Sequence, residues 1–193
     1  EHISAISPVV KTSGQAIAGS NNWPTTIQGV NTEFLDIRKM EVDEGVMFSD
    51  FHIKRASKVC LLGQTVVEEL FPDKESVIGE TVRFGKIPFK VIGVLGEKGE
   101  NSFGQDQDDI ILAPYTTVQK RVMAITHIQD IYASATSEAD SEAAEEEIAE
   151  ALRLSHELGE DDEDDFTVRS QQELISTFSS TSEMLTILLG AIA

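Results

Sequence analysis

The sequence is poor in basic residues and in cysteine, and each shortage excludes a class of function. Lysine and arginine number 15 against 34 aspartates and glutamates, a formal net charge of -19. An acidic field of this size repels phosphate backbones, which argues against DNA or RNA as a partner. The hydrophobic content of 40% and the charged content of 25% are ordinary for a globular chain of 193 residues.

The one cysteine, Cys60, lies in the apolar stretch "KVCLLG". It cannot form an internal disulfide, and zinc fingers and CxxC redox centres require more than one thiol. Free cysteines of this kind are usually buried, so we predict an inert thiol in the core.

Motifs that carry catalysis are missing as well. The four histidines do not form HExxH or another paired metal-binding spacing. The sequence has no GxSxG elbow, no GxxxxGK[ST] loop and no GxGxxG fingerprint. The densest basic cluster is Lys54 and Arg55 beside His52. We therefore predict a domain that is not an enzyme, with no catalytic residues, no cofactor and no metal site.

The stretch "GQDQDD" is the best candidate for a metal site. Its aspartates are Asp106, Asp108 and Asp109, but a calcium loop starting at Asp106 would need glycine sixth and glutamate twelfth. The residues at those positions are Ile111 and Thr117. We interpret the stretch as a polar turn before a buried strand, with aspartates that cap backbone amides. A looser oxygen site remains the alternative.

Most of the excess acid is local. Residues 138–165 contain 14 acidic residues and one basic residue, Arg153. The helical spacing of apolar residues predicts an amphipathic helix, which starts at a capping box of Ser137 and Asp140 and ends in a left-handed cap at Gly159. Its glutamates and the acidic run 161–165 are interpreted as solvated surface, and a specific calcium site in that run is disfavoured.

The strand pattern predicts an α+β fold in two parts. Short β-like runs at 128–135 and 165–170 flank the acidic helix, which is a split βαβ pattern. The first third adds strand candidates and a short helical stretch, together half of a ferredoxin-like sandwich; these are residues 3–10, 25–30, 31–38 and 39–45.

Between these parts lies a β-rich block, residues 57–126. It contains a strand and helix over 57–71, a hairpin over 80–95 with Gly85 at its turn, and a strand before Pro114 that leads into a helix. The hairpin residues predicted to face inward are Val82, Phe84, Phe89, Val91 and Val94.

A series of segments in a fixed order then suggests a family. The segments are "ISPVV", "GVNTEFLDIR" with "VDEGVMFSD", "VCLLGQTVVEELF", "IGETVRFGKIPFKVIGVL", "QDQDDIILAPYTTVQKR" and "DFTVRS". Together they resemble the extracytoplasmic domain of MacB-type ABC transporter permeases, within the broader FtsX-like family.

The resemblance implies a porter-like α/β subdomain formed by residues 1–56 and 127–183, with a sabre-like β-rich subdomain inserted at 57–126. The apolar end "MLTILLGAIA" is too short to span a bilayer, so by itself it fits either a core helix or the cut start of a membrane helix. The resemblance favours the second, over residues 184–193.

For function, the resemblance implies a non-catalytic domain of a bacterial inner-membrane permease, facing the periplasm. It would couple ATP hydrolysis by a separate cytoplasmic nucleotide-binding domain or subunit to export by mechanotransmission. The implied partners are that ATPase through the membrane part, a periplasmic adaptor, an outer-membrane channel and a second permease subunit. The alternatives are a lipoprotein-releasing permease domain and a free-standing acidic cation-binding protein.

Overall fold

The computed structural model describes residues 2–101, 104–159 and 161–171, and it divides into two compact units. One unit is Ala5–Ser134 and the other combines residues 1–4 with 135–193. The predicted border between residues 56 and 57 falls inside the first of these units. The partition into porter-like and sabre-like subdomains therefore stays a prediction. The predicted α+β class is confirmed, since the chain contains both strands and helices and most of its strand pairs are antiparallel.

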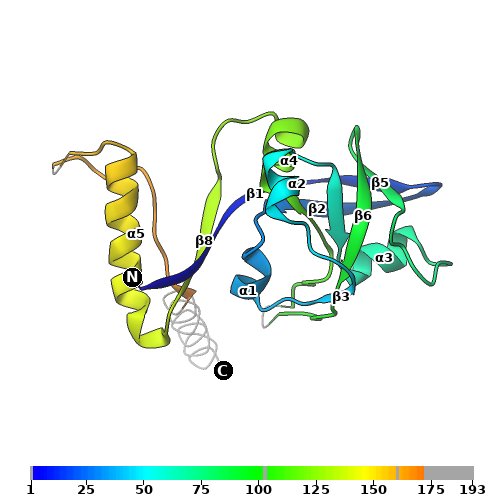
Figure 1. Ribbon diagram of the computed structural model, residues 1–193, viewed down its shortest axis with the longest axis horizontal. Coiled ribbons are helices and arrows are strands. Elements are labelled where there is room, and N and C mark those ends of the chain that lie inside the picture. Colours follow the sequence, from blue (N-terminus) through cyan, green and yellow to red (C-terminus); the bar gives the residue numbers. More distant parts are fainter. Residues whose placement is uncertain (1, 102–103, 160, 172–193) are drawn as a thin grey trace, which may run out of the picture. The chain divides into compact units, whose positions relative to one another are not determined.

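The pairings of six strands of the unit Ala5–Ser134 form a closed ring, and four of these strands, β1, β2, β5 and β6, are labelled in Figure 1. Their order around the ring is β2, β7, β4, β6, β5 and β1, and β1 pairs back with β2. The pairs β2–β7 and β4–β6 are parallel, and the other registered pairs are antiparallel. Two more strands lie outside the ring, β8 beside β1 and β3 beside β6. The strands are β1 (Ile3–Ala18), β2 (Asn21–Val30), β3 (Val42–Gly45), β4 (Val59–Leu62), β5 (Thr81–Phe84), β6 (Ile87–Leu95), β7 (Ile110–Pro114) and β8 (Asp130–Ala135).

Alternate residues of the central strands enter two different hydrophobic clusters. In β4, Cys60 and Leu62 belong to a cluster to which all six ring strands contribute, while Leu61 belongs to a second cluster. Because successive side chains of a strand point to opposite faces, β4 is buried on both. The second cluster packs against the helix α1 (Phe34–Arg38), whose Phe34 is 1% exposed.

The predicted elements of the middle block are confirmed. A strand, β4, runs into α3 (Gln64–Leu70), and β7 leads through α4 (Tyr115–Thr117) into a π-helical turn, Val118–Met123. The hairpin β5–β6 turns at Gly85, which has φ +57°. All five residues predicted to face inward there are buried, none more than 4% exposed. The remaining helix of this unit, α2, is Asp50–Lys54.

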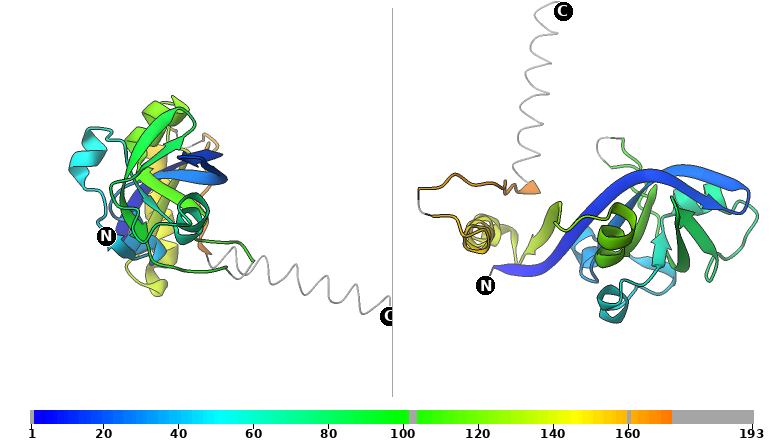
Figure 2. Two further views of the ribbon diagram at one scale, coloured as in Figure 1. Left: turned by 90° about the vertical axis from the view of Figure 1, so that its right-hand side faces the viewer. Right: turned by 90° about the horizontal axis from the view of Figure 1, so that it is seen from above.

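The first two strands are longer than predicted. β1 continues to Ala18 and pairs with β2, with Val10 opposite Gly29 at one end and Ala18 opposite Asn21 at the other. Figure 2 shows the result as a long two-stranded ribbon in blue. Glycine and serine in this stretch lower its strand propensity, and the pairing with a neighbour overrides it.

In the other unit, the acidic helix forms but its ends differ from the prediction. A 3₁₀ turn, Glu138–Asp140, precedes α5 (Ser141–Ser155). Ser137 Oγ donates to the Asp140 carboxylate over 2.6 Å, but no side chain caps the first amides. The left-handed residue after α5 is Glu157, at φ +57°, and not Gly159.

The strand predicted at 165–170 does not form. The described residues 161–170 contain only turns, bends and irregular backbone. Just before this stretch, the guanidinium of Arg153 donates to the carbonyl oxygens of Gly159 and Asp162. The apolar segment 184–193, predicted as the cut start of a membrane helix, lies outside the described residues.

Candidate functional site

Asp108 anchors the loop that follows β6, and it is not available as a ligand. The residue is 4% exposed. Its carboxylate accepts backbone N–H groups from Lys98, at 3.0 and 3.1 Å, and from Gly99, at 2.7 Å. Charge-assisted bonds of this kind are stronger than neutral ones. The interpretation of "GQDQDD" as a turn whose aspartates cap backbone amides is thus correct for Asp108.

The two neighbouring aspartates also have structural partners. Asp106 accepts the backbone N–H of Asp108 and the hydroxyl of Thr65, both over 2.7 Å. Asp109 accepts the indole N–H of Trp23 over 3.0 Å. The three carboxylates therefore hold different segments. In the part of the chain that the structure describes, no three His, Cys, Asp or Glu side chains are arranged to hold a metal ion.

The acidic run after α5 is organised by Arg153. Besides the two carbonyl oxygens, its guanidinium contacts the carboxylate of Asp164. Asp162 Oδ2 accepts the N–H of Gly159 over 2.7 Å, and Asp165 pairs with His156 over 2.7 Å. The aspartates of the acidic run are exposed and contact different partners, as expected for a solvated turn.

Cys60 is buried, as predicted, with 0% exposure. Burial raises the pKa of its thiol, because the low-dielectric core disfavours the thiolate.

The basic cluster near His52 forms a small exposed group. Arg55 lies 4.6 Å above the ring of Phe51, which is 58% exposed, and His52 accepts the N–H of Ser49 to close a capping box.

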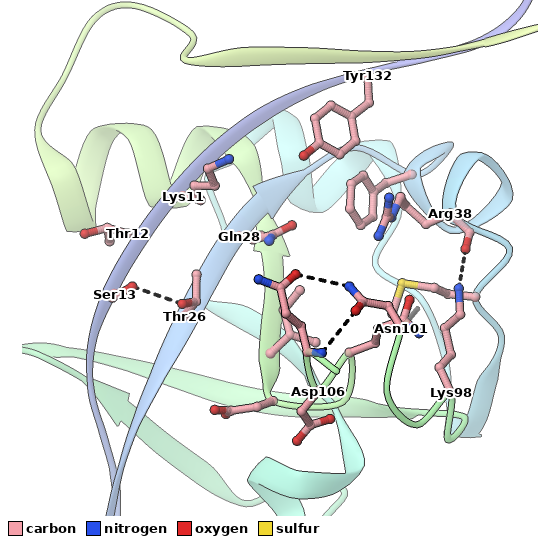
Figure 3. Close-up of a pocket in the computed structure, with 16 residues that line it drawn as sticks. Lys11, Thr12, Ser13, Thr26, Gln28, Arg38, Lys98, Asn101, Asp106 and Tyr132 are labelled. Carbon is pink, nitrogen blue, oxygen red and sulfur yellow. Dashed lines mark hydrogen bonds between the residues drawn. The ribbon is translucent and has the colours of Figure 1, made fainter. Parts of the chain in front are cut away.

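A hollow in the unit Ala5–Ser134 has a volume of about 730 Å³ (Figure 3). It lies against β1 and β2 and is bordered by α1, β8, residues 98–101 and residues 105–110. Its lining is mostly polar and includes three cationic side chains, four carboxamides and four hydroxyls. These residues are Lys11, Arg38 and Lys98; Gln28, Asn101, Gln105 and Gln107; Thr12, Ser13, Thr26 and Tyr132.

Two contacts fix the cationic side of this pocket. Lys11 Nζ lies 3.0 Å from Asp130 Oδ2, and the pKa of Lys11 is raised, first by that hydrogen bond. Lys98 Nζ donates to the carbonyl oxygen of Arg38 over 2.6 Å. At one wall, the Tyr132 ring stacks on Phe34 with centroids 5.9 Å apart. No sequence motif marked these residues, because they come from four segments that only the fold brings together.

Comparison with known proteins defines the class. The family described as the MacB-like periplasmic core domain matches residues 1–151. A macrolide export ATP-binding/permease protein MacB of Syntrophobacter fumaroxidans is 34% identical over 98% of this chain and 34% of the relative. The protein of the same description in Chlorobium luteolum is 37% identical over 95% of this chain and 27% of the relative. The chain thus spans about a third of the length of these curated relatives.

The fold has counterparts among solved structures. The periplasmic region of MacB from Actinobacillus actinomycetemcomitans aligns with a TM-score of 0.76 at 22% identity, over 93% of this chain and 77% of that one. The extracellular domain of the noncanonic ABC-type transporter YknZ from Gram-positive bacteria gives 0.70 at 19% identity, over 83% and 80%. The chain belongs to the family of MacB-like periplasmic core domains, and the predicted resemblance is confirmed.

Within the described residues, no helix has both the length and the apolarity that crossing a bilayer requires.

Proposed function

We propose that this chain is the extracytoplasmic part of an ABC transporter permease and works without an active site of its own. The observation that supports the proposal most strongly is the match over 98% of the chain to a protein that carries both an ATP-binding part and a permease part. The chain accounts for 34% of that relative. In this proposal, ATP hydrolysis belongs to a cytoplasmic domain or subunit outside the chain.

In this proposal the domain transmits motion. ATP binding and hydrolysis in the cytoplasm move the membrane helices of a permease pair, and the domain moves with them. The closed ring of strands suits this task, because a ring leaves no free edge among its six members and deforms less than an open sheet. Such coupling needs a domain arrangement with two states, not a catalytic constellation.

The moving domain would dock a periplasmic adaptor, which leads to an outer-membrane channel. Export is favoured over lipoprotein release because the relatives at 34% and 37% identity are described as macrolide export proteins. The polar lining of the pocket in Figure 3 is unlike the mostly apolar lining of sites for large apolar molecules, so we place no macrolide there.

A distance measurement across the permease pair tests the proposal. Ser20 is exposed in the turn between β1 and β2, and Cys60 is buried, so Ser20→Cys provides one reactive thiol in this domain. Spin labels on the full-length permease in lipid nanodiscs should report different distances between the two subunits with and without ATP and vanadate. Identical distance distributions in the two states would refute mechanotransmission through this domain.

A further inference from the structure

The pocket in the unit Ala5–Ser134 brings three cations together from three different elements. Lys11 lies on β1, Arg38 ends α1, and Lys98 lies in the segment after β6. This unit holds 13 basic and 17 acidic residues, so most of the chain's net charge of -19 belongs to the other unit. The acidic field that repels anions from the chain as a whole is therefore weak around this pocket.

The side chains at the cationic end offer donors that the protein does not use. A guanidinium carries five N–H groups and an ammonium three. Among the described residues Arg38 has no ion-pair partner, and Lys98 uses one donor on the Arg38 carbonyl oxygen. Figure 3 shows the Lys11 ammonium, the Gln28 carboxamide and the Tyr132 hydroxyl turned toward the same open space. A ligand that fits this end must be rich in acceptors.

Two carboxylates also line the pocket, at its other end. Asp106 and Asp109 already accept hydrogen bonds from Thr65 and Trp23. Figure 3 shows Asp106 at the end of the pocket opposite Tyr132. A third carboxylate, Asp130, pairs with Lys11. With Asp130 included, three negative charges balance the three cations, so the pocket as a whole has little net attraction for a doubly charged phosphate. A carboxylate group brings a single charge to the cationic end and suits this balance better.

We propose that this pocket binds a carboxylate group. The planar guanidinium of Arg38 donates two parallel hydrogen bonds to the carboxylate. Lys11 and Lys98 add positive charge. Tyr132 and Gln28 donate further hydrogen bonds that fix the orientation of the carboxylate. The carboxylate has two possible sources, a small organic acid or an Asp or Glu side chain on a protein partner. The inference rests on the pocket alone and does not require the proposed role in export.

Amide-resolved NMR titration of the ¹⁵N-labelled chain at low salt tests the proposal in three arms. The probes are succinate, a blocked Ala-Glu-Glu-Ala peptide and inorganic phosphate. Saturable shifts centred on Lys11, Gln28, Arg38 and Tyr132 are expected with both carboxylates. Tighter succinate binding identifies a free organic acid as the source, and tighter peptide binding identifies a partner side chain. Tighter binding of phosphate than of either carboxylate would overturn the assignment.

Variants separate this site from general attraction of anions to basic surface. Arg38→Gln should weaken succinate binding about tenfold or more. The affinity of Arg38→Lys should lie between those of Arg38→Gln and the wild type, because lysine keeps the positive charge but cannot form the bidentate hydrogen bonds. Asp130→Asn should strengthen binding about two- to fivefold by removing the competitor for Lys11. The matched control is Lys90→Gln, an exposed cation on β6 outside the pocket.

Lys90→Gln should leave the affinity unchanged. Arg38 is exposed, so its variants are expected to fold, and circular dichroism checks this. Equal loss in Arg38→Gln and Lys90→Gln, or no saturable shift up to about 20 mM of either carboxylate, would show that the pocket is not a carboxylate site.

Discussion

Replacing Asp108 by alanine should destabilise the fold more than any other change in the aspartate turn. The change removes the acceptor of two backbone N–H groups, those of Lys98 and Gly99, at a site where the residue is 4% exposed. An unsatisfied buried donor costs about 1–3 kcal/mol, so the loss should be about 2–5 kcal/mol. Asp108→Asn keeps one acceptor oxygen and the shape of the side chain, and it should cost about 1–2 kcal/mol.

Urea unfolding provides the assay, with the fluorescence of the single tryptophan, Trp23, as the probe. Thermal midpoints should fall in the same order, by about 2–4 °C per kcal/mol. Glu68→Ala, on the exposed side of α3, is the control and should stay within about 0.5 kcal/mol of the wild type. The reasoning fails if Asp108→Ala costs under about 1 kcal/mol, or if calcium at millimolar concentration stabilises the wild type but not this variant.

Three further predictions follow from single residues. Gly45→Ala should destabilise the fold more than Gly85→Ala. Both glycines have positive φ, but only at Gly45 would a Cβ collide with a carbonyl oxygen on β6. Equal urea midpoints of the two variants would contradict this. Cys60 should resist Ellman's reagent at pH 8 in the folded chain and react at once in urea, because burial shields its thiol and raises its pKa. Fast labelling of the folded chain would contradict this. The pKa of Asp140 is lowered, first by the hydrogen bond from Ser137. The advantage of wild type over Asp140→Asn in urea should therefore be full at pH 6 and decrease as the pH falls below about 4; an advantage equally large at pH 6 and pH 2.5 would refute the linkage.

Sequence reasoning predicted the elements of the middle block because their signals are local. The hairpin β5–β6 alternates between buried and more exposed residues over Thr81–Phe84 and from Ile87 to Val91, and the strand β7 ends at Pro114. Both patterns specify a strand and its end without reference to distant residues. The buried state of Cys60 followed in the same way from its apolar neighbours.

Closure of the ring could not be predicted, because it depends on pairings between distant segments. β2 pairs in parallel with β7, Thr26 opposite Ile110, and β1 pairs with β5, Ala16 opposite Phe84. No local pattern encodes such partners. The strand expected at 165–170 failed for the converse reason, since strand propensity without a partner forms no ladder.

The pocket could not be predicted from the sequence either, because its residues come from segments that are distant in the chain. Lys11, Arg38, Lys98 and Tyr132 lie on four separate segments, and each looks like an ordinary surface or core residue in its own stretch. Only the packing of α1 and β8 against the β1–β2 ribbon gathers them. The aspartates of the turn are the reverse. Their motif is conspicuous in the sequence, but their carboxylates accept structural hydrogen bonds and form no ligand site.

The central claim is that this chain forms the extracytoplasmic domain of a membrane permease. The most direct test follows the full-length product of the parent gene, tagged at its C-terminus, through an alkaline wash of membranes and a protease treatment of spheroplasts. The account predicts that the product stays in the membrane pellet and that external protease cleaves within this domain. Release into the soluble fraction, or protection of the domain from external protease, would contradict it.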